Sequence, residues 1–475
     1  MDSKFSTLEE AHSGSNTPLS GIGPRPRRKP AGRPAKPGID QSLSARTLIG
    51  VLKGCFPGLN KQLNDLPDPR RQDMCLYLAA HIWWHIIATF LFRCGSRNAF
   101  DEKRNSGQAP WNLGELCGQK AQDPRFEGKP KITCSDNAAL HAGRVSPQQV
   151  AQIPLEMIRK LLKRRMFDNA RLFGHWYVLI VDGTVQEKCR KGFEGDGKTS
   201  SGDARYRYVL QVRIQGPDGH LFPFLHESMD MHDPVAEKED CELNAFIRIS
   251  QRIKDLFPRM PICLVGDALY ACQTVEQRCR EYGWKYVLTF KEGRQPTTWK
   301  ELLQLLPLSR SNVLQTLLGP NGKEGRLDYR WVEDLMLGQH TTNAILAGEV
   351  TPHAAVLYSF ITNFTNLTSD RVIDIVQVGR SRSRIEDTFN AQKNHGIGLE
   401  HVFCAESNAA KNYYTMMQVA EILWVLTCHG GIKRIYQWAK NATEQGLARA
   451  IWEGLCAYPI PPDLPPLAQI RFGFS

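Results

Sequence analysis

Hydrophobic residues recur with two different periods along the chain, and the change between them divides it. From residue 47 to 172 the spacing is helical, and the apolar stretch 76–92 predicts a buried helix. Residues 146–166 predict an amphipathic helix that starts with a Ser146 cap and Pro147 and ends in basic residues. We interpret this region as a helical DNA-binding domain, with a plain helical cap on the next domain as the alternative.

From residue 173 the period shortens to that of strands. A buried strand at 176–183 is followed by two strands that flank the turn sequence QGPDG. A helix, a strand that ends near Asp267, a second helix and a further strand come next. This succession of elements predicts a mixed α/β sheet.

Several alternating strands then interrupt the rhythm, and the chain returns to long helices at 370–394 and 407–429. The pattern therefore predicts an α/β fold with a β-rich insertion and an N-terminal helical domain. The expected units are a disordered basic arm at 1–46, the helical domain at 47–172, the first part of the core at 173–294, the insertion at 295–365, the second part of the core at 366–430 and a C-terminal helical segment at 431–475.

Composition narrows the partners that the protein could bind. The 475 residues include 60 Lys and Arg against 49 Asp and Glu, a formal net charge of +11. This charge favours a polyanionic partner, nucleic acid first and an anionic membrane surface second. The 13 cysteines form no C-x-x-C pair, which argues against a disulfide framework or a structural zinc site and for a reducing cytoplasm. No apolar run is long enough for a membrane span, so we expect none.

The arm contains the Pro-rich basic stretch PRPRRKPAGRPAKPG at 24–38, a composition that cannot form a core. Its centre, Gly32-Arg33-Pro34, is similar to the AT-hook, an extended peptide that inserts arginine into a narrow minor groove. Arg33 is thus a candidate DNA contact. The alternative is a solvated cationic tail.

The stretch GFEGDGKTSSG at 192–202 matches the phosphate-loop pattern G-x4-G-K-[ST]. A working phosphate loop joins a strand directly to a helix, so that backbone amides converge on the phosphates. Here a strand pattern follows, and Glu194 and Asp196 would repel a triphosphate. We therefore expect a hairpin connection and no nucleotide as a partner.

Two aspartates close predicted strands, Asp182 in VLIVDG and Asp267 in CLVGDALY. Neighbouring strands of an α/β sheet deliver such side chains to one edge, where two carboxylates can share a divalent cation. The alternative is that each aspartate caps the next element.

A third carboxylate, Glu386, lies in the helical pattern GRSRSRIEDTFNAQKNHG between Arg382 and Lys393. At 100° per residue these three side chains fall within about 40° of one another on the helix. An ordinary surface ion pair between Arg382 and Glu386 is the alternative. Other acidic residues rank behind Glu386 because none has flanking cations at helical spacing: Glu227, Asp240, Glu242 and Asp387.

The order of the two aspartates, the β-rich insertion and R-x3-E-x6-K resembles the DDE transposases of bacterial insertion sequences, over residues 173 to 430. The resemblance implies a ribonuclease H-like catalytic core. It also implies that Asp182, Asp267 and Glu386 are catalytic metal ligands and that Arg382 and Lys393 bind the DNA end. The family motif begins with tyrosine where this chain has Gly379, which affects how a base at the transposon end would be held.

The resemblance implies cleavage at transposon ends and strand transfer into target DNA, with Mg²⁺, or alternatively Mn²⁺, as the cofactor. The implied partners are transposon-end and target DNA, and the implied assembly is a homodimer on paired ends in a bacterial cytoplasm, at the nucleoid. One alternative is a catalytically silent, transposase-derived DNA-binding protein. Another is a glycoside hydrolase with paired carboxylates, which would not explain the basic helix or the net charge of +11.

Overall fold

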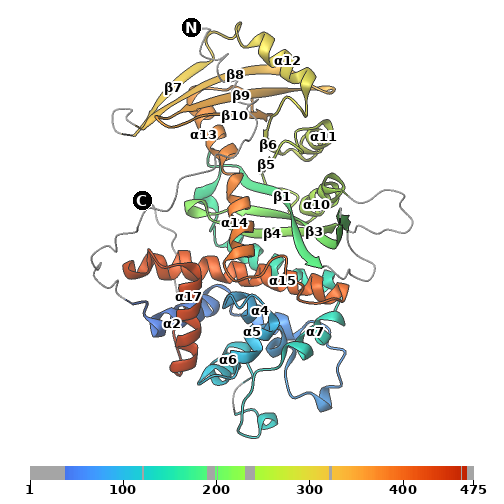
Figure 1. Cartoon of the computed structure of the whole chain (residues 1–475), viewed down its shortest axis with the longest axis vertical. Helices are drawn as coiled ribbons and strands as arrows, with labels where there is room; N and C mark the ends of the chain where they lie inside the picture. Colours follow the sequence, from blue (N-terminus) through green and yellow to red (C-terminus); the bar gives the residue numbers. More distant parts are fainter. Residues whose placement is uncertain are drawn as a thin grey trace, which may run out of the picture.

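The computed structural model describes residues 38–119, 122–189, 198–200, 202–229, 241–319, 324–461 and 463–467. Figure 1 shows three tiers, with a curved sheet at one end, a smaller group of strands in the middle and a helical body at the other end. The long helix α15 (Ser407–Trp424) lies between the middle strands and the helical body.

The middle tier contains the strands that the sequence predicts first. Strand β3 lies between β1 and β4 and pairs antiparallel with both, and β5 and β6 run parallel to β1 in the order β4-β3-β1-β5-β6. The predicted succession of three strands, helix, strand, helix and strand is confirmed, with one additional short strand, β2 (Lys198–Ser200), between β1 and β3. The bounds are β1 Tyr177–Cys189, β3 Gly202–Gln215, β4 Leu221–Met229, α10 Glu242–Leu256, β5 Ile262–Gly266, α11 Gln273–Tyr282 and β6 Lys285–Thr289.

The β-rich segment extends the same sheet. Strand β10 pairs antiparallel with β6, and the order continues β10-β9-β8-β7. With the short strand β2, which pairs with β3, the sheet has ten strands among the described residues. Helix α13 covers one face, where Phe360 occupies the space in which a Cβ on Gly379 would lie, 2.5 Å away. The bounds are α12 Pro296–Leu305, β7 Val313–Leu318, β8 Gly325–Leu337, β9 His340–Val350, β10 Ala355–Thr362 and α13 Ser369–Arg380.

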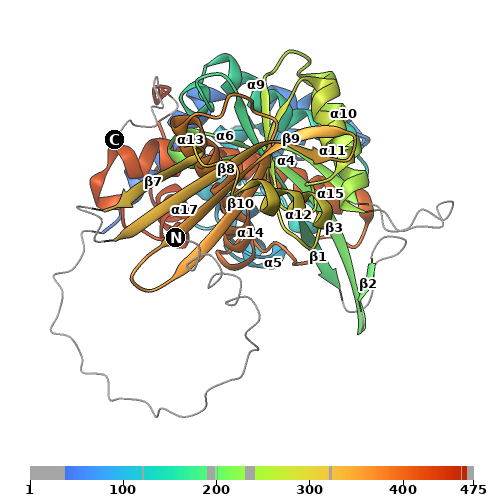
Figure 2. The same cartoon turned by 90° about the horizontal axis from the view of Figure 1, so that it is seen from above.

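The helical body is built from both ends of the chain, because C-terminal helices pack on N-terminal ones (Figures 1 and 2). Every residue of α4 is buried, as the apolar stretch predicts. Among the described residues, no helix is long and apolar enough to cross a membrane. The bounds are α2 Gln41–Cys55, α3 Leu59–Asn64, α4 Ala79–Leu91, α5 Arg97–Lys103, α6 Ala109–Cys117, α7 Ser135–Gly143, the π-helix η6 Val425–Ile432, α16 Lys433–Ile435 and α17 Glu444–Ala457.

The single helix expected at 146–166 is wrong in two respects. The chain forms a short helix α8 (Pro147–Val150) and then α9 (Gln152–Lys163). The Ser146 side chain does not cap a helix but donates a 2.7 Å hydrogen bond to the Gln148 side chain. The physical reason for the break is Pro154, which supplies no backbone donor in the first turn of α9, so the helix is not continuous with α8.

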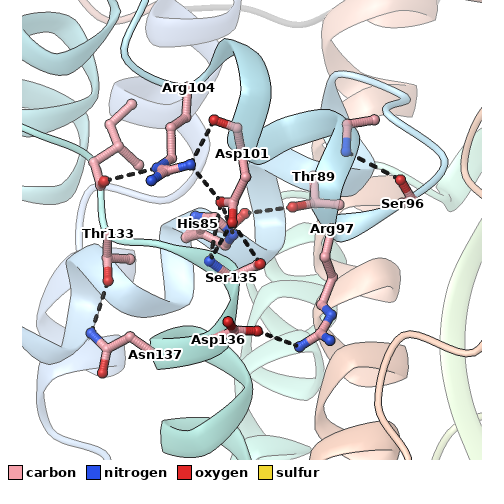
Figure 3. Close-up of polar contacts among 12 residues, drawn as sticks. His85, Thr89, Ser96, Arg97, Asp101, Arg104, Thr133, Ser135, Asp136 and Asn137 are labelled. Atoms are coloured by element: carbon pink, nitrogen blue, oxygen red, sulfur yellow. Dashed lines mark hydrogen bonds and ion pairs between the residues drawn. The ribbon is translucent and has the colours of Figure 1, made fainter.

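A polar cluster ties α4, α5 and α7 together (Figure 3). The Asp101 carboxylate accepts hydrogen bonds from the Ser135 hydroxyl, at 2.7 Å, and from the Ser135 amide, at 3.1 Å. Arg104 lies 3.0 Å from the same carboxylate, and the buried His85 ring lies 3.8 Å from it. Asp101 therefore satisfies free donors at the start of α7 and is itself neutralised by Arg104.

Buried histidines make the folded state sensitive to acid. Burial lowers the pKa of His81 and His141 to about 4 and that of His85, His226 and His429 to about 3, from 6.5. Below pH 6.5 these five histidines therefore bind more protons in the unfolded chain than in the folded chain. Each of them lowers the stability as the pH approaches 4, by at most about 1.4 kcal/mol per pH unit. We expect the melting temperature to drop between pH 7 and pH 5. The drop should be smaller in His85→Phe than in the wild-type protein. His353 is exposed, so His353→Gln is the control and should show the wild-type drop. Equal drops in the wild-type protein and both variants would contradict this account.

Candidate active site

Strands β1 and β5 bring Asp182 and Asp267 to the same level of the sheet. The parallel register pairs Ile180 with Val265, and each aspartate lies two residues farther on. The expectation that Asp182 ends its strand is wrong, because β1 continues to Cys189 by pairing with β3, and Asp182 stands opposite Gln211. Asp182 instead marks the point where β1 extends beyond the end of β5.

Both aspartates also make local backbone hydrogen bonds. The Asp182 carboxylate accepts from the amide of the next residue at 2.9 Å, and Asp267 accepts from the Leu269 amide at 2.8 Å. The capping alternative is therefore partly realised at Asp267. One oxygen of each carboxylate is used in this way, and the other oxygen of Asp182, Oδ2, lies 3.7 Å from the Arg382 guanidinium.

The structure adds Glu242, the first residue of α10, to this edge. The Tyr270 hydroxyl donates a 2.5 Å hydrogen bond to Glu242 Oε1. A Cβ at position 183 would lie only 2.6 Å from Glu242 Oε2, so Gly183 makes room for this carboxylate beside Asp182. Sequence reasoning ranked Glu242 low because it lacks flanking cations, and only the fold brings it to the aspartates.

The electrostatics of the edge reflect crowded negative charge. Burial and the nearby Glu242 and Asp267 carboxylates raise the pKa of Asp182 to about 7, against the lowering effect of Arg382. Burial and Asp267 likewise raise the pKa of Glu242, although the hydrogen bond from Tyr270 opposes this. Carboxylates that repel one another in a partly buried site are stabilised by any cation that binds between them.

Arg382 supplies positive charge at this edge and links it to Glu386. The predicted single helix 370–394 is wrong, because the chain breaks at Ser381 and Arg382 before α14 (Ser383–Asn394) begins. The Arg382 guanidinium lies 2.5 Å from Glu386 Oε1 and 3.7 Å from Asp182 Oδ2. Glu386, with a half-exposed side chain, is thus connected to Asp182 through Arg382.

Asp182, Asp267 and Glu242 together form what we call the acidic edge of the sheet. Lys393 lies beside a part of β1 that is farther along the strand than this edge. Its ammonium group is 2.7 Å from Glu400 Oε1. Glu400 in turn exchanges backbone hydrogen bonds with β1, from its amide to the Gln186 carbonyl at 2.8 Å and from the Lys188 amide to its carbonyl at 3.0 Å. Helix α14 therefore runs beside β1, with Glu386 near Asp182 and Lys393 near the far end of the strand.

Two other motifs lie partly or wholly outside the described residues. Arg33, the candidate minor-groove contact, is outside them. Of the phosphate-loop match, residues 192–197 and 201 are also outside, but Lys198–Ser200 form strand β2, which pairs with β3. No helix begins at Lys198, so the lysine is not followed by the helix N-terminus that a phosphate loop requires.

A second group of cations gathers at the end of α9, on the helical body. The α9 basic cluster consists of Lys160, Lys163, Arg164 and Arg165, of which the last three are exposed. Arg164 donates a 2.6 Å hydrogen bond to the Gly54 carbonyl at the end of α2. The cluster is thus held against α2 and presents several positive charges to solvent.

The residue types at the acidic edge are suited to binding a hard cation, but their present arrangement is not. Carboxylate oxygens are the ligands that Mg²⁺ and Mn²⁺ prefer. Within the described ranges, however, no group of three or more His, Cys, Asp or Glu side chains is arranged to hold a metal ion. Arg382 already sits between Asp182 and Glu386, so a metal bound by both would have to replace its charge there.

Comparison with known proteins adds a distant structural likeness. No protein-family model and no curated protein matches the chain. Among solved structures it is similar to a piggyBac transposase synaptic complex with hairpin DNA, with a TM-score of 0.40 and 9% sequence identity over 86% of this chain and 80% of that chain. A likeness at this level assigns neither a family nor an activity.

Proposed function

We propose that this protein is a DNA transposase that cleaves phosphodiester bonds at transposon ends and joins the ends to target DNA. In this proposal the strands β4-β3-β1-β5-β6 form a ribonuclease H-like catalytic core, and the protein acts at the bacterial nucleoid in the cytoplasm. The observation that carries the proposal is the meeting of Asp182, Asp267 and Glu242 at one sheet edge, with Arg382 joining Glu386 to it.

The proposed ligands of Mg²⁺ or Mn²⁺ are Asp182, Asp267 and Glu386, with Glu242 facing the two aspartates. Divalent ions in such sites activate a water or a 3′-hydroxyl and stabilise the leaving oxygen of an in-line displacement. The chain itself supplies the rest of the site. Gly183 keeps the space beside Asp182 open, and the Tyr270 hydroxyl fixes the orientation of Glu242.

Positive charges are proposed to hold the DNA by its phosphates, which positions a duplex without reading its sequence. Arg382 and Lys393 would contact the end being cut, and Arg33 the minor groove nearby. The exposed α9 basic cluster supports a DNA-binding role for the helical body, where it would contact a more distant stretch of duplex. A homodimer would hold the two ends of one element.

The proposal is tested by DNA cleavage. We expect short inverted repeats in the DNA that flanks the coding region, and Mg²⁺-dependent nicking of a duplex that carries them by the purified protein. A scrambled duplex of equal length is the control. Binding to the repeats without nicking in Mg²⁺ or Mn²⁺ would favour the second candidate, a silent DNA-binding protein, and absence of both would remove the transposase proposal.

Lys393 gives a test of the DNA contact. Lys393→Ala should lower both end binding and cleavage about tenfold, because a phosphate contact is lost, whereas Lys393→Arg should retain part of both. Gel-shift and nicking assays measure the two effects. The exposed Lys440→Ala is the control, and equal behaviour of the two alanine variants would show that Lys393 serves only its ion pair with Glu400.

Gly183 gives a test of the Glu242 position. In Gly183→Ala the new Cβ would lie 2.6 Å from Glu242 Oε2, so the carboxylate must move while the strand stays intact. We expect cleavage to fall about tenfold with little change in melting temperature, since a displaced supporting group costs roughly 10- to 100-fold. Gly348→Ala, in strand β9 with its nearest neighbour atom 3.9 Å from the new Cβ, is the matched control. Unchanged cleavage in Gly183→Ala would show that the position of Glu242 is irrelevant.

A further inference from the structure

Strand β7 is the outermost strand at one end of the ten-stranded sheet. It lies along the outer edge in both views (Figures 1 and 2). Its only strand neighbour among the described residues is β8, so one side of its backbone has no strand partner there.

Hydrogen bonds at the two ends of β7 show which backbone groups point outward. The Trp331 amide donates to the Asn312 carbonyl at 3.3 Å, and the Glu324 amide donates to the Leu318 carbonyl at 3.2 Å. Even-numbered residues of β7 therefore bond to β8. Because these bonds alternate along an antiparallel pair, Val313, Gln315 and Leu317 direct their amides and carbonyls away from the sheet.

The side chains of β7 make this edge unusually suited to pairing. The strand VLQTLL contains no charged residue and no proline, although these are usual means of blocking an edge. Val313 is 49% exposed and Leu317 66% exposed, while Leu314 and Leu318 pack against the core on the other face. Leu308, which leads into the strand, is 76% exposed. Apolar surface of this kind on an open edge is typical of an interface.

We propose that β7 pairs antiparallel with β7 of a second copy of this chain, across a twofold axis that passes through Gln315. In this register Gln315 faces Gln315 of the partner subunit, and Val313 faces Leu317 of the partner subunit. Each facing pair consists of residues with outward backbone groups, so each exchanges two hydrogen bonds. The exposed valine and leucine side chains then form two identical apolar pairs on one face.

A second copy fits this edge better than an unrelated partner because the strand is complementary to itself. The twofold operation places each exposed apolar side chain on another apolar side chain, as an isologous interface requires. Two chains that each carry a net charge of +11 can also approach through a segment that bears no charge. This pairing is independent of the chemistry at the acidic edge, and it would fix the distance between two such edges.

The oligomeric state tests the pairing. A contact of this size belongs to the weak class, so we expect a dimer in sedimentation equilibrium at tens of micromolar protein without DNA. Leu317→Lys should shift the protein to monomer, because two lysines would be placed against apolar side chains. Leu140→Lys, a 55% exposed leucine on the helical body, is the control and should remain a dimer. A wild-type monomer, or a dimer that Leu317→Lys leaves intact, would overturn the proposal.

A cross-link tests the register even if Leu317→Lys fails to fold. Facing residues in a bonded antiparallel pair have Cα atoms about 5.5 Å apart, within the range of a disulfide. Under mild oxidation Gln315→Cys should yield a covalent dimer well above the wild-type background from the native cysteines. Arg310→Cys, which lies before the strand, should not. Equal cross-linking of these two variants would refute the register.

Discussion

Asp267→Asn and Asp182→Asn are each expected to reduce Mg²⁺-dependent cleavage by about a thousandfold or more, roughly 4 kcal/mol of transition-state stabilisation. The carboxamide keeps the size of the side chain but removes the charge that would hold a divalent ion. Binding to the DNA ends should change little, because the proposed phosphate contacts are cationic side chains elsewhere. Nicking under single-turnover conditions and gel shifts measure the two properties separately.

Asp182→Asn should also stabilise the folded protein in the absence of metal. Asp182 is largely buried and lies near the carboxylates of Glu242 and Asp267, and both its burial and these negative charges oppose its ionised form. A neutral asparagine removes that repulsion, so we expect a higher melting temperature for Asp182→Asn together with lost cleavage, the usual exchange of stability for function. Cleavage by Asp267→Asn at the wild-type rate would eliminate the proposed metal role.

The sequence predicted the parts of the fold that depend on local pattern. Most of the apolar stretch 76–92 forms the fully buried α4, and QGPDG forms a hairpin turn in which Asp218 and Gly219 adopt positive φ values of 54° and 73°. These features follow from side-chain polarity and turn chemistry alone. The strand that contains Asp182 and the strand that ends just before Asp267 could be predicted for the same reason.

Features that depend on distant contacts were not predictable. The residues of β1 beyond Asp182 are largely polar, yet they form a strand because β3 and the Glu400 segment pair with them. The break between α13 and α14 has no proline or glycine at its position. Close packing of Gly379 on Phe360 fixes α13 there, and the Ser381 hydroxyl bonds to the carbonyl of Val378. The contact between Gly379 and Phe360 is tertiary, and contacts of this kind override local propensity.

The sequence pattern and the fold point to different residues as the third carboxylate of the site. Helical spacing selects Glu386, and the fold pairs it with Arg382, which also reaches Asp182. The fold also brings Glu242 to this edge, where its carboxylate raises the pKa of Asp182. If Glu386 completes the metal site, Arg382 must exchange its partner when metal and DNA bind. Its guanidinium would then be released to contact a phosphate beside the cut.

Glu386→Gln is therefore expected to lower cleavage by at least about a hundredfold, with end binding retained, because a ligand is lost while the phosphate contacts remain. Glu227→Gln is the matched control, since Glu227 is also paired with arginines, on α10, at 2.6 and 2.9 Å. It should cleave at nearly the wild-type rate. Binding of Mn²⁺, followed by its paramagnetic resonance spectrum, should weaken in Glu386→Gln and not in Glu227→Gln. If Glu386→Gln instead cleaves and binds Mn²⁺ normally while Glu242→Gln does neither, the third carboxylate is Glu242. The arginine and glutamate of the motif would then form only the surface ion pair that their spacing also permits.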